Sequence, residues 1–219
     1  MSRVGLEDRV RALAARVPPE ERARVESATD RLAAFLSILL GRNAEMNLVS
    51  ARSAEPAVLV DRHLFDSLLG LALLPTPHGR AFHLLDIGAG GGFPAIPLLI
   101  ARPDLAGTLV ESSRKKAAFL HEALSRLALT ARVVDARFPD SFPLDGAPRY
   151  DVLTTRAVGS AGQLVRAARR VLAPGARALL WTTRPLADAA LRASRAGKHA
   201  FHQAPGTDIR GILSLECFT

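Results

Sequence analysis

The sequence LLDIGAGGGFPAIPL occupies residues 84–98 and joins an apolar run to a turn of glycines and then to a second apolar run. The first run, at 81–87, has the length and composition of a buried strand. The second, at 93–102, reads as a helix with Pro94 in its first turn, where the missing N–H leaves no helical hydrogen bond unmade. Glycines between them let the backbone bend sharply and keep Cβ atoms out of the path of a ligand. This stretch therefore predicts a strand, a ligand-binding turn and a helix.

The alternation of strand and helix continues toward the C-terminus. Further strands are expected at 108–111, 132–135, 150–155 and 176–182, helices at 113–127, 162–172 and 186–195, and a terminal hairpin at 198–203 and 211–218. Such alternation predicts a mostly parallel sheet that is covered on both faces. Because no helix separates the last two strands, we expect the last strand to be antiparallel. The predicted fold is α/β, with a mostly parallel seven-stranded sheet.

Helical periodicity dominates the first 75 residues. Apolar residues recur at helical spacing over 6–17 and form a full stripe over 32–40, which ends near Gly41. A third helical pattern covers 54–74 and ends at a Pro-Thr-Pro sequence. These segments lack a core large enough to stand alone, so we expect them to pack on the sheet. We divide the chain into a helical extension at 1–78 and a ligand-binding domain at 79–219.

Length and composition exclude several classes of protein. A chain of 219 residues with 48% hydrophobic residues can bury a core without a disulfide or metal. Its single cysteine, Cys217, excludes an internal disulfide and a multi-cysteine zinc site, and no other metal-binding cluster is legible. The longest apolar run is too short to cross a membrane, and the charged N-terminus lacks the apolar core of a signal peptide. We expect a cytoplasmic protein without a metal.

Positive charge is concentrated in the second part of the chain. The net charge is +8, of which residues 81–219 contribute +7. Such an excess points to an anionic partner, with nucleic acid the leading candidate. Arg114, Lys115 and Lys116 open the helix expected at 113–127. They are either phosphate contacts or simply a solvated helix face.

Two acidic residues mark the expected ligand. Glu111 ends the second strand, 25 residues after Asp86, where a carboxylate can accept hydrogen bonds from both hydroxyls of a ribose. With the glycine turn, this arrangement predicts an adenosine-containing cofactor. Asp86 suits the methionine end of S-adenosylmethionine. The spacing of Gly90, Gly92 and Ala95 also matches the loose dinucleotide pattern, so a nicotinamide cofactor stays open, whereas the absence of a GxxxxGK[ST] sequence argues against a P-loop ATPase.

Five motifs together resemble a known family. They are NAEMNLVS (43–50), RHLFDSL (62–68), DIGAGGGFPAIPL (86–98), LVESSRKKAAFL (109–120) and TTRAV (154–158). In order and spacing over about residues 30–185 they resemble the bacterial small-subunit ribosomal RNA guanine-N7 methyltransferases, the glucose-inhibited division protein B family. The resemblance implies a class I methyltransferase fold with a helical N-terminal extension, S-adenosylmethionine as cofactor, and a guanine of 16S ribosomal RNA as substrate, in naked RNA or in the 30S subunit. We expect a monomer.

The resemblance also implies site residues. The cofactor contacts of the family fall on Gly88, Phe93, Phe138, Pro139 and Arg156, and Glu111 matches its acidic ribose-binding position. Gly90 is a further cofactor-binding candidate from the glycine turn itself. The chain departs from the family at Phe138-Pro139, where Val/Ala-Glu is frequent, and at Trp181–Arg184, where a Lys-Gly pair is usual. Arg184 is the candidate to supply the missing positive charge and to contact RNA.

Three further residues are candidates for the catalytic centre. Arg156 follows the fourth strand and could hold the cofactor carboxylate through a bidentate pair. His63 and Asp66 lie one helical turn apart and can hydrogen-bond each other, either as a structural pair or, through the resemblance, in the site. Because guanine N7 carries a lone pair and no proton, methyl transfer to it needs alignment and no general base.

Three alternative functions stay open from the sequence. A small-molecule methyltransferase would share the cofactor but not respond to ribosomal subunits. A non-catalytic RNA-binding relative, suggested by the departure at residues 181–184, would bind 30S subunits without transferring a methyl group. An NAD-dependent oxidoreductase would prefer the nicotinamide cofactor to S-adenosylmethionine.

Overall fold

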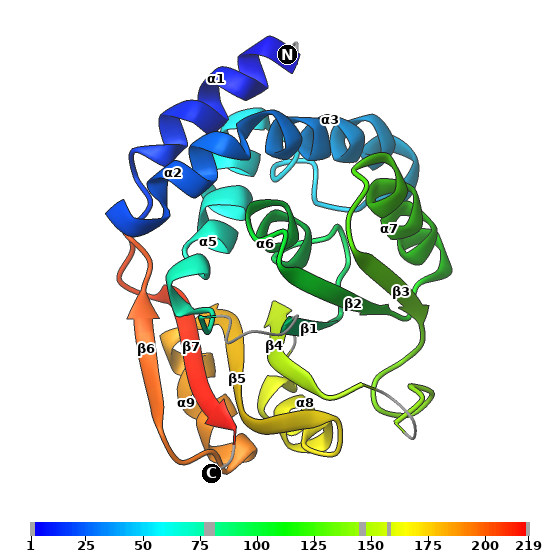
Figure 1. Cartoon of the computed structure of the whole chain (residues 1–219), viewed down its shortest axis with the longest axis vertical. Helices are drawn as coiled ribbons and strands as arrows, with labels where there is room; N and C mark the ends of the chain where they lie inside the picture. The colour runs from blue at the N-terminus through cyan, green and yellow to red at the C-terminus, as the bar shows by residue number, and fades with distance from the viewer. Residues whose placement is uncertain (1–2, 77–81, 145–147, 157–158, 218–219) are drawn as a thin grey trace.

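A computed structural model describes residues 3–76, 82–144, 148–156 and 159–217, and its centre is one seven-stranded sheet in the order β3-β2-β1-β4-β5-β7-β6 (Figure 1). The strands are β1 (Phe82–Ile87), β2 (Leu105–Glu111), β3 (Ala131–Asp135), β4 (Tyr150–Arg156), β5 (Leu172–Thr183), β6 (His199–Gln203) and β7 (Arg210–Cys217). The five strands from β3 to β5 are parallel, whereas β7 runs antiparallel to both β5 and β6. The predicted sheet and its antiparallel last strand are therefore confirmed, with β7 inserted between β5 and β6.

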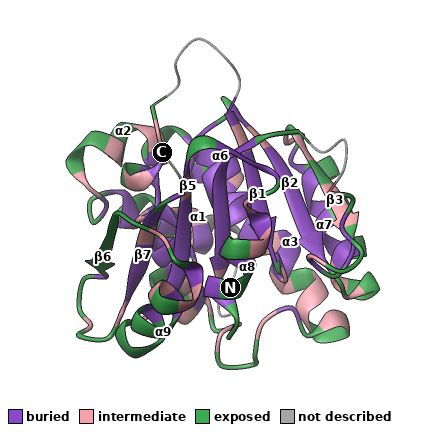
Figure 2. Ribbon diagram, turned by 90° about the horizontal axis from the view of Figure 1, so that it is seen from below, coloured by how far each residue is buried: buried purple, intermediate pink, exposed green. Residues whose placement is uncertain are grey.

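Helices cover both faces of the sheet. They are α1 (Arg3–Ala14), α2 (Pro19–Ser27), α3 (Thr29–Met46), α4 (Pro56–Val58), α5 (Phe65–Leu68), α6 (Ala95–Ala101), α7 (Arg114–Arg126), α8 (Ala161–Ala168) and α9 (Arg184–Ser194). Alternate strand residues point to opposite faces, so Leu84 packs with α3, α6 and α7, whereas its neighbour Leu85 packs with α8 and α9. Figure 2 shows the central strands buried between these helical layers, whereas the edge strand β6 is largely exposed. No described helix is long and apolar enough to cross a membrane.

Two expectations for the N-terminal helices are wrong. The stripe expected to end near Gly41 continues to Met46, where Asn47 takes a left-handed conformation and ends α3. The helix expected over 54–74 is instead a series of short segments: α4, a π-helix at Leu59–Leu64, α5 and a 3-10 turn at Leu71–Leu73. In addition, α2 begins at Pro19 with two glutamates in its first turn, a helix start that the periodicity did not reveal.

The N-terminal helices share one hydrophobic core with the sheet. A single cluster of buried side chains extends from Leu6 in α1 through Phe35 in α3 to Ile212 in β7. The ring of Phe35 meets that of Phe93 edge-on, with centroids 5.2 Å apart, directly beside the glycine turn. The helical segments thus pack on the sheet as expected. The proposed boundary between 78 and 79 lies outside the described residues.

The carboxyl ends of the parallel strands meet at one edge of the sheet. Ile87, Glu111, Arg156 and Thr183 end β1, β2, β4 and β5, and Arg210 begins the antiparallel β7 opposite Thr183. Ligands of open α/β sheets bind beyond this edge. The residues there form the candidate site.

Candidate functional site

The glycine turn leaves one face open. Gly88, Gly90 and Gly92 all have positive φ, at 77°, 53° and 89°. A Cβ atom at Gly92 would lie 2.6 Å from Ile96 Cδ1, so the space beside Gly92 is filled by the core. A Cβ atom at Gly90 would meet nothing closer than 3.8 Å and would instead extend into open space. The backbone around Gly90 is therefore accessible to a ligand.

Glu111 lies against this turn. Its Oε2 accepts the Gly90 N–H at 2.8 Å and its Oε1 accepts the Ser113 N–H at 2.8 Å, while the residue is buried. A carboxylate oxygen has two lone pairs, so each oxygen can still accept a second hydrogen bond. Glu111 thus joins the turn to the start of α7 and can accept a sugar hydroxyl at the same time.

Asp86 is fully buried beneath the turn. Its Oδ1 accepts a hydrogen bond from Thr154 Oγ1 at 2.6 Å, whereas its Oδ2 is buried without a partner. Burial raises the pKa of Asp86 to about 7; the Thr154 hydrogen bond opposes the increase and the neighbouring Glu111 adds to it. An unpartnered buried carboxylate oxygen is unfavourable unless a donor or cation approaches it. Asp86 therefore fits a ligand that carries positive charge.

The π-helix brings the RHLFDSL motif to the turn. His63 lies in its last part, and the His63 ring packs at a tilt against Phe93, with centroids 5.5 Å apart. Burial, together with charge repulsion from Arg156, Arg210 and Arg62, lowers the pKa of His63 to about 4. His63 is consequently neutral at physiological pH. π-helical segments are rare and frequently lie at functional sites.

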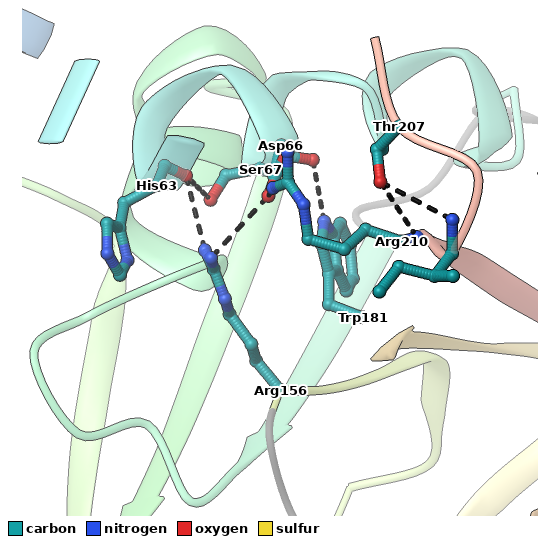
Figure 3. Close-up of polar contacts among 8 residues, drawn as sticks. His63, Asp66, Ser67, Arg156, Trp181, Thr207 and Arg210 are labelled. Atoms are coloured by element: carbon teal, nitrogen blue, oxygen red, sulfur yellow. Dashed lines mark hydrogen bonds and ion pairs between the residues drawn. The ribbon is translucent and has the colours of Figure 1, made fainter. Parts of the chain in front are cut away.

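Asp66 is the centre of a polar network (Figure 3). Its Oδ2 accepts a hydrogen bond from Arg210 at 2.7 Å and lies 3.6 Å from the guanidinium of Arg156. Arg156 also donates to the His63 carbonyl at 3.3 Å, and Trp181 Nε1 donates to the Asp66 carbonyl at 2.6 Å. The expected hydrogen bond between the His63 and Asp66 side chains does not form, because the His63 ring turns toward Phe93 and Asp66 is held by arginines.

The remaining predicted cofactor residues lie at the next strand end. Phe138 and Pro139 follow β3, where the Ala136 N–H donates to the Glu111 carbonyl at 3.1 Å. The Phe138 ring is buried and packs against Phe142, with centroids 5.2 Å apart. The structure therefore brings Asp86, Gly88, Gly90, Phe93 and Glu111 together and connects Phe93 through His63 to Arg156 and Asp66. Phe138 and Pro139 follow shortly after Ala136, which is the residue that contacts Glu111.

The predicted RNA contacts lie apart from this network. Arg114 and Lys115 are exposed and Lys116 is half-buried in the first turn of α7. Arg184 begins α9, and its guanidinium lies over the Phe201 ring of β6 at 4.5 Å from the centroid. Asn43 and Asn47 serve the end of α3, since Asn43 Oδ1 accepts the Val49 N–H at 2.9 Å and Asn47 is the left-handed cap.

Two candidate site residues, Thr154 and Arg210, were not predicted from the sequence. Thr154 is the partner of Asp86, and it stands within the TTRAV motif, which could have identified it. Arg210 is the closest partner of Asp66, and nothing in its local sequence signals that role. Within the described ranges, no three His, Cys, Asp or Glu side chains gather as a metal site would require.

Comparison with known proteins extends these observations. The family model "GidB: rRNA small subunit methyltransferase G" matches residues 28–202. A "Ribosomal RNA small subunit methyltransferase G" from Acidiphilium cryptum (strain JF-5) is 40% identical over 191 residues, which cover 85% of this chain and 84% of that protein. One from Stenotrophomonas maltophilia (strain K279a) is 43% identical over 142 residues, or 64% of this chain and 62% of that protein.

Solved structures agree on the fold. The crystal structure of a putative O-methyltransferase from Klebsiella pneumoniae matches with a TM-score of 0.59 and 17% identity, covering 84% of this chain and 90% of that chain. At this identity the likeness concerns the fold alone. The predicted class I methyltransferase fold is confirmed.

Proposed function

The chain belongs to the rRNA small subunit methyltransferase G family, and from its site we propose that it transfers a methyl group from S-adenosylmethionine to N7 of a guanine in 16S ribosomal RNA. The family membership rests on a match over residues 28–202. The predicted cofactor and reaction agree with that membership.

One observation carries the proposal. The open face of Gly90 lies between two buried carboxylates, Glu111 beside it and the half-satisfied Asp86 beneath it. This arrangement suits a molecule with ribose hydroxyls at one end and positive charge at the other. S-adenosylmethionine has both, whereas a nicotinamide dinucleotide places its anionic pyrophosphate at the glycine turn, where the half-satisfied Asp86 carboxylate is unfavourable.

The chain's own residues then bind and orient. Glu111 would accept the ribose hydroxyls, and Asp86 would face the charged methionine end. Phe93 and Phe138 supply apolar walls at the two strand ends. S-adenosylmethionine supplies an electrophilic methyl group: the guanine N7 lone pair forms the new N–C bond, the C–S bond breaks, and its electron pair remains on sulfur. Because no proton moves, the neutral His63 is consistent with a reaction that depends on alignment.

The RNA contacts are proposed from charge. Arg114 and Lys115 are exposed cations at the start of α7, at the same sheet edge as Glu111. Phosphate contacts there would position the RNA without reading its sequence, and the affinity should decrease as salt increases. We propose 16S ribosomal RNA within the 30S subunit as the substrate, met in the cytoplasm by a monomer of this chain.

Isothermal titration with S-adenosylmethionine tests the cofactor site. We expect Glu111→Gln to weaken binding about tenfold or more, because only one of the two terminal atoms of the amide can accept a hydrogen bond. Glu122→Gln is the matched control, because Glu122 lies on α7, the helix that follows Glu111, and pairs with Arg42 and Arg126 away from the turn. An unaltered affinity in the Glu111 variant, or binding of NAD in preference to S-adenosylmethionine by the unmodified protein, would refute the assignment.

A further inference from the structure

A cavity of about 330 Å³ lies next to the cofactor site, over the ends of β4 and β5 and the start of β7. Its walls are mainly apolar and include Leu69, Leu180 and Ile212. The volume is at the small end of the range of about 300–1,000 Å³ that is typical of ligand pockets, so it suits a single flat ring system. Thr155 lines the cavity and donates through Oγ1 to the Ile87 carbonyl at 2.9 Å, one residue before the glycine turn.

Asp66 is the acidic group on the wall of this cavity. The residue is only 8% exposed, and its Oδ1 is buried without any hydrogen-bond partner. Burial raises the pKa of Asp66, although Arg210 and Arg156 oppose the increase. An unsatisfied buried acceptor destabilises the folded state. The Asp66 carboxylate can therefore accept a hydrogen bond from a ligand in the cavity.

Asp66 is held from three parts of the chain. Trp181 in β5 donates to its backbone carbonyl, Arg210 at the start of β7 holds Oδ2, and Arg156 at the end of β4 lies between Asp66 and His63. The Trp181 ring passes so close to Gly70 that a Cβ atom there would lie 2.5 Å from it. Figure 3 shows these side chains converging on Asp66. A carboxylate fixed in this way can discriminate between ligands by the position of their donors.

We propose that this cavity holds the acceptor guanine, with its N1–H and 2-amino edge directed at the Asp66 carboxylate. The proposal rests on the proposed function and adds how the base is selected. Among the four RNA bases, guanine alone presents a ring N–H next to an amino group on this edge, and enzymes that act on extruded bases read that edge. Adenine presents a ring acceptor there, which a carboxylate repels.

The same contact assists the reaction. Guanine acquires positive charge as N7 is methylated, so the hydrogen bonds from N1–H and the amino group to Asp66 become stronger as the bond forms. An interaction that strengthens in this way raises the rate as well as the affinity. Asp66 is then a base-reading residue, and Arg210 and Trp181 are positioning residues that act through it.

Competition by free nucleotides tests the proposal. Methyl transfer to undermodified 30S subunits is measured in the presence of GMP, IMP or AMP at millimolar concentration. IMP lacks only the 2-amino group, so we expect it to inhibit about tenfold more weakly than GMP, and AMP to inhibit more weakly still. Equal inhibition by the three nucleotides, or none by GMP, overturns the proposal.

Variants separate this inference from the proposed function. We expect Asp66→Asn to lose the preference for GMP over IMP while the dissociation constant of S-adenosylmethionine, measured by calorimetry, changes less than about threefold. Asp151→Asn is the matched control, because Asp151 is a buried carboxylate of the same strand as Arg156 but accepts the His83 N–H away from the cavity. It should retain the preference.

Two other outcomes are informative. An Asp66→Asn protein that binds the cofactor and still prefers GMP contradicts the inference and leaves the proposed function intact. If the unmodified protein methylates 30S subunits and the Asp66 variant loses only its affinity for the cofactor, the cavity holds the methionine end of the cofactor. That outcome also overturns the inference. Absence of cofactor binding by the unmodified protein would instead contradict the proposed function itself.

Discussion

Asp86 illustrates how a single residue can reduce stability in favour of function. Its side chain is completely buried, and one of its two oxygens is unpartnered. Burial raises its pKa to about 7, so at neutral pH the folded protein carries a carboxylate that is close to half ionised. A ligand with positive charge would stabilise the ionised form. The residue is best explained by what it binds.

The stability of the Asp86→Asn variant should report this directly. In the unfolded chain an aspartate has a pKa near 3.9, so ionisation of Asp86 destabilises the folded state increasingly as the pH rises from about 4 to 7 and fully above 7. We expect the free energy of unfolding of the variant, relative to the unmodified protein, to increase by roughly 2–3 kcal/mol between pH 5 and pH 8. Urea titration at both pH values measures it. A pH-independent difference would show that Asp86 is not perturbed.

At the scale of elements, the glycine turn combines a packing role with a binding role. Gly92 packs against the Ile96 side chain, whereas Gly90 faces open space. The two roles predict different phenotypes for substitutions only two residues apart. The matched comparison for Gly90 is Gly175, which also has a positive φ, at 74°, and no neighbour near its Cβ position, but lies at the beginning of β5.

Both Gly90→Ala and Gly175→Ala should lose about 1 kcal/mol of stability, because alanine is strained at positive φ. Only Gly90→Ala should also weaken the binding of S-adenosylmethionine, by about tenfold or more, because the methyl group of the alanine enters the space of the ligand. Thermal unfolding gives the first quantity and calorimetry the second. If the two variants bound the cofactor equally well, the open face of Gly90 would not be the binding surface.

Elements with a strong local pattern could be predicted from the sequence. The strands 81–87 and 150–155 agree with β1 and β4 within one residue, because both are short apolar runs between clear breaks. The start of β5 was missed, since Pro174 and Gly175 resemble the end of a helix; the structure accommodates them in an irregular part of the strand, where the pairing with β4 shifts register. The π-helix has no sequence signature of its own, so 54–74 resembled one continuous helix.

The site likewise contains residues that could be predicted from the sequence and residues that could not. Asp86, the glycines and Glu111 follow each other at strand ends, and a parallel sheet must bring such residues together. Arg210 and Asp66 are 144 residues apart, and their contact depends on the insertion of β7 next to β5. The partner of His63 was predicted wrongly for a related reason: the orientation of its ring is decided by Phe93, which comes from another segment.

For the whole molecule, the shared core implies a single cooperative unit. The helices at the N-terminus and one face of the sheet bury their side chains in one cluster, and the single tryptophan, Trp181, lies where the sheet meets α5. Domains with one core usually unfold in a single transition. We expect the urea midpoints from tryptophan fluorescence and from helical circular dichroism to coincide. Loss of helix well before the change in fluorescence would indicate an independent N-terminal domain.

The central claim is methyl transfer to ribosomal RNA, and one measurement tests it most directly. Purified protein is incubated with tritiated S-adenosylmethionine and undermodified 30S subunits, and the labelled nucleoside is then identified and mapped. We predict label in 7-methylguanosine at one position of 16S ribosomal RNA, with no label when Asp66 and Glu111 are both substituted. Label in another nucleoside, or binding of the subunit without any transfer, would contradict the account.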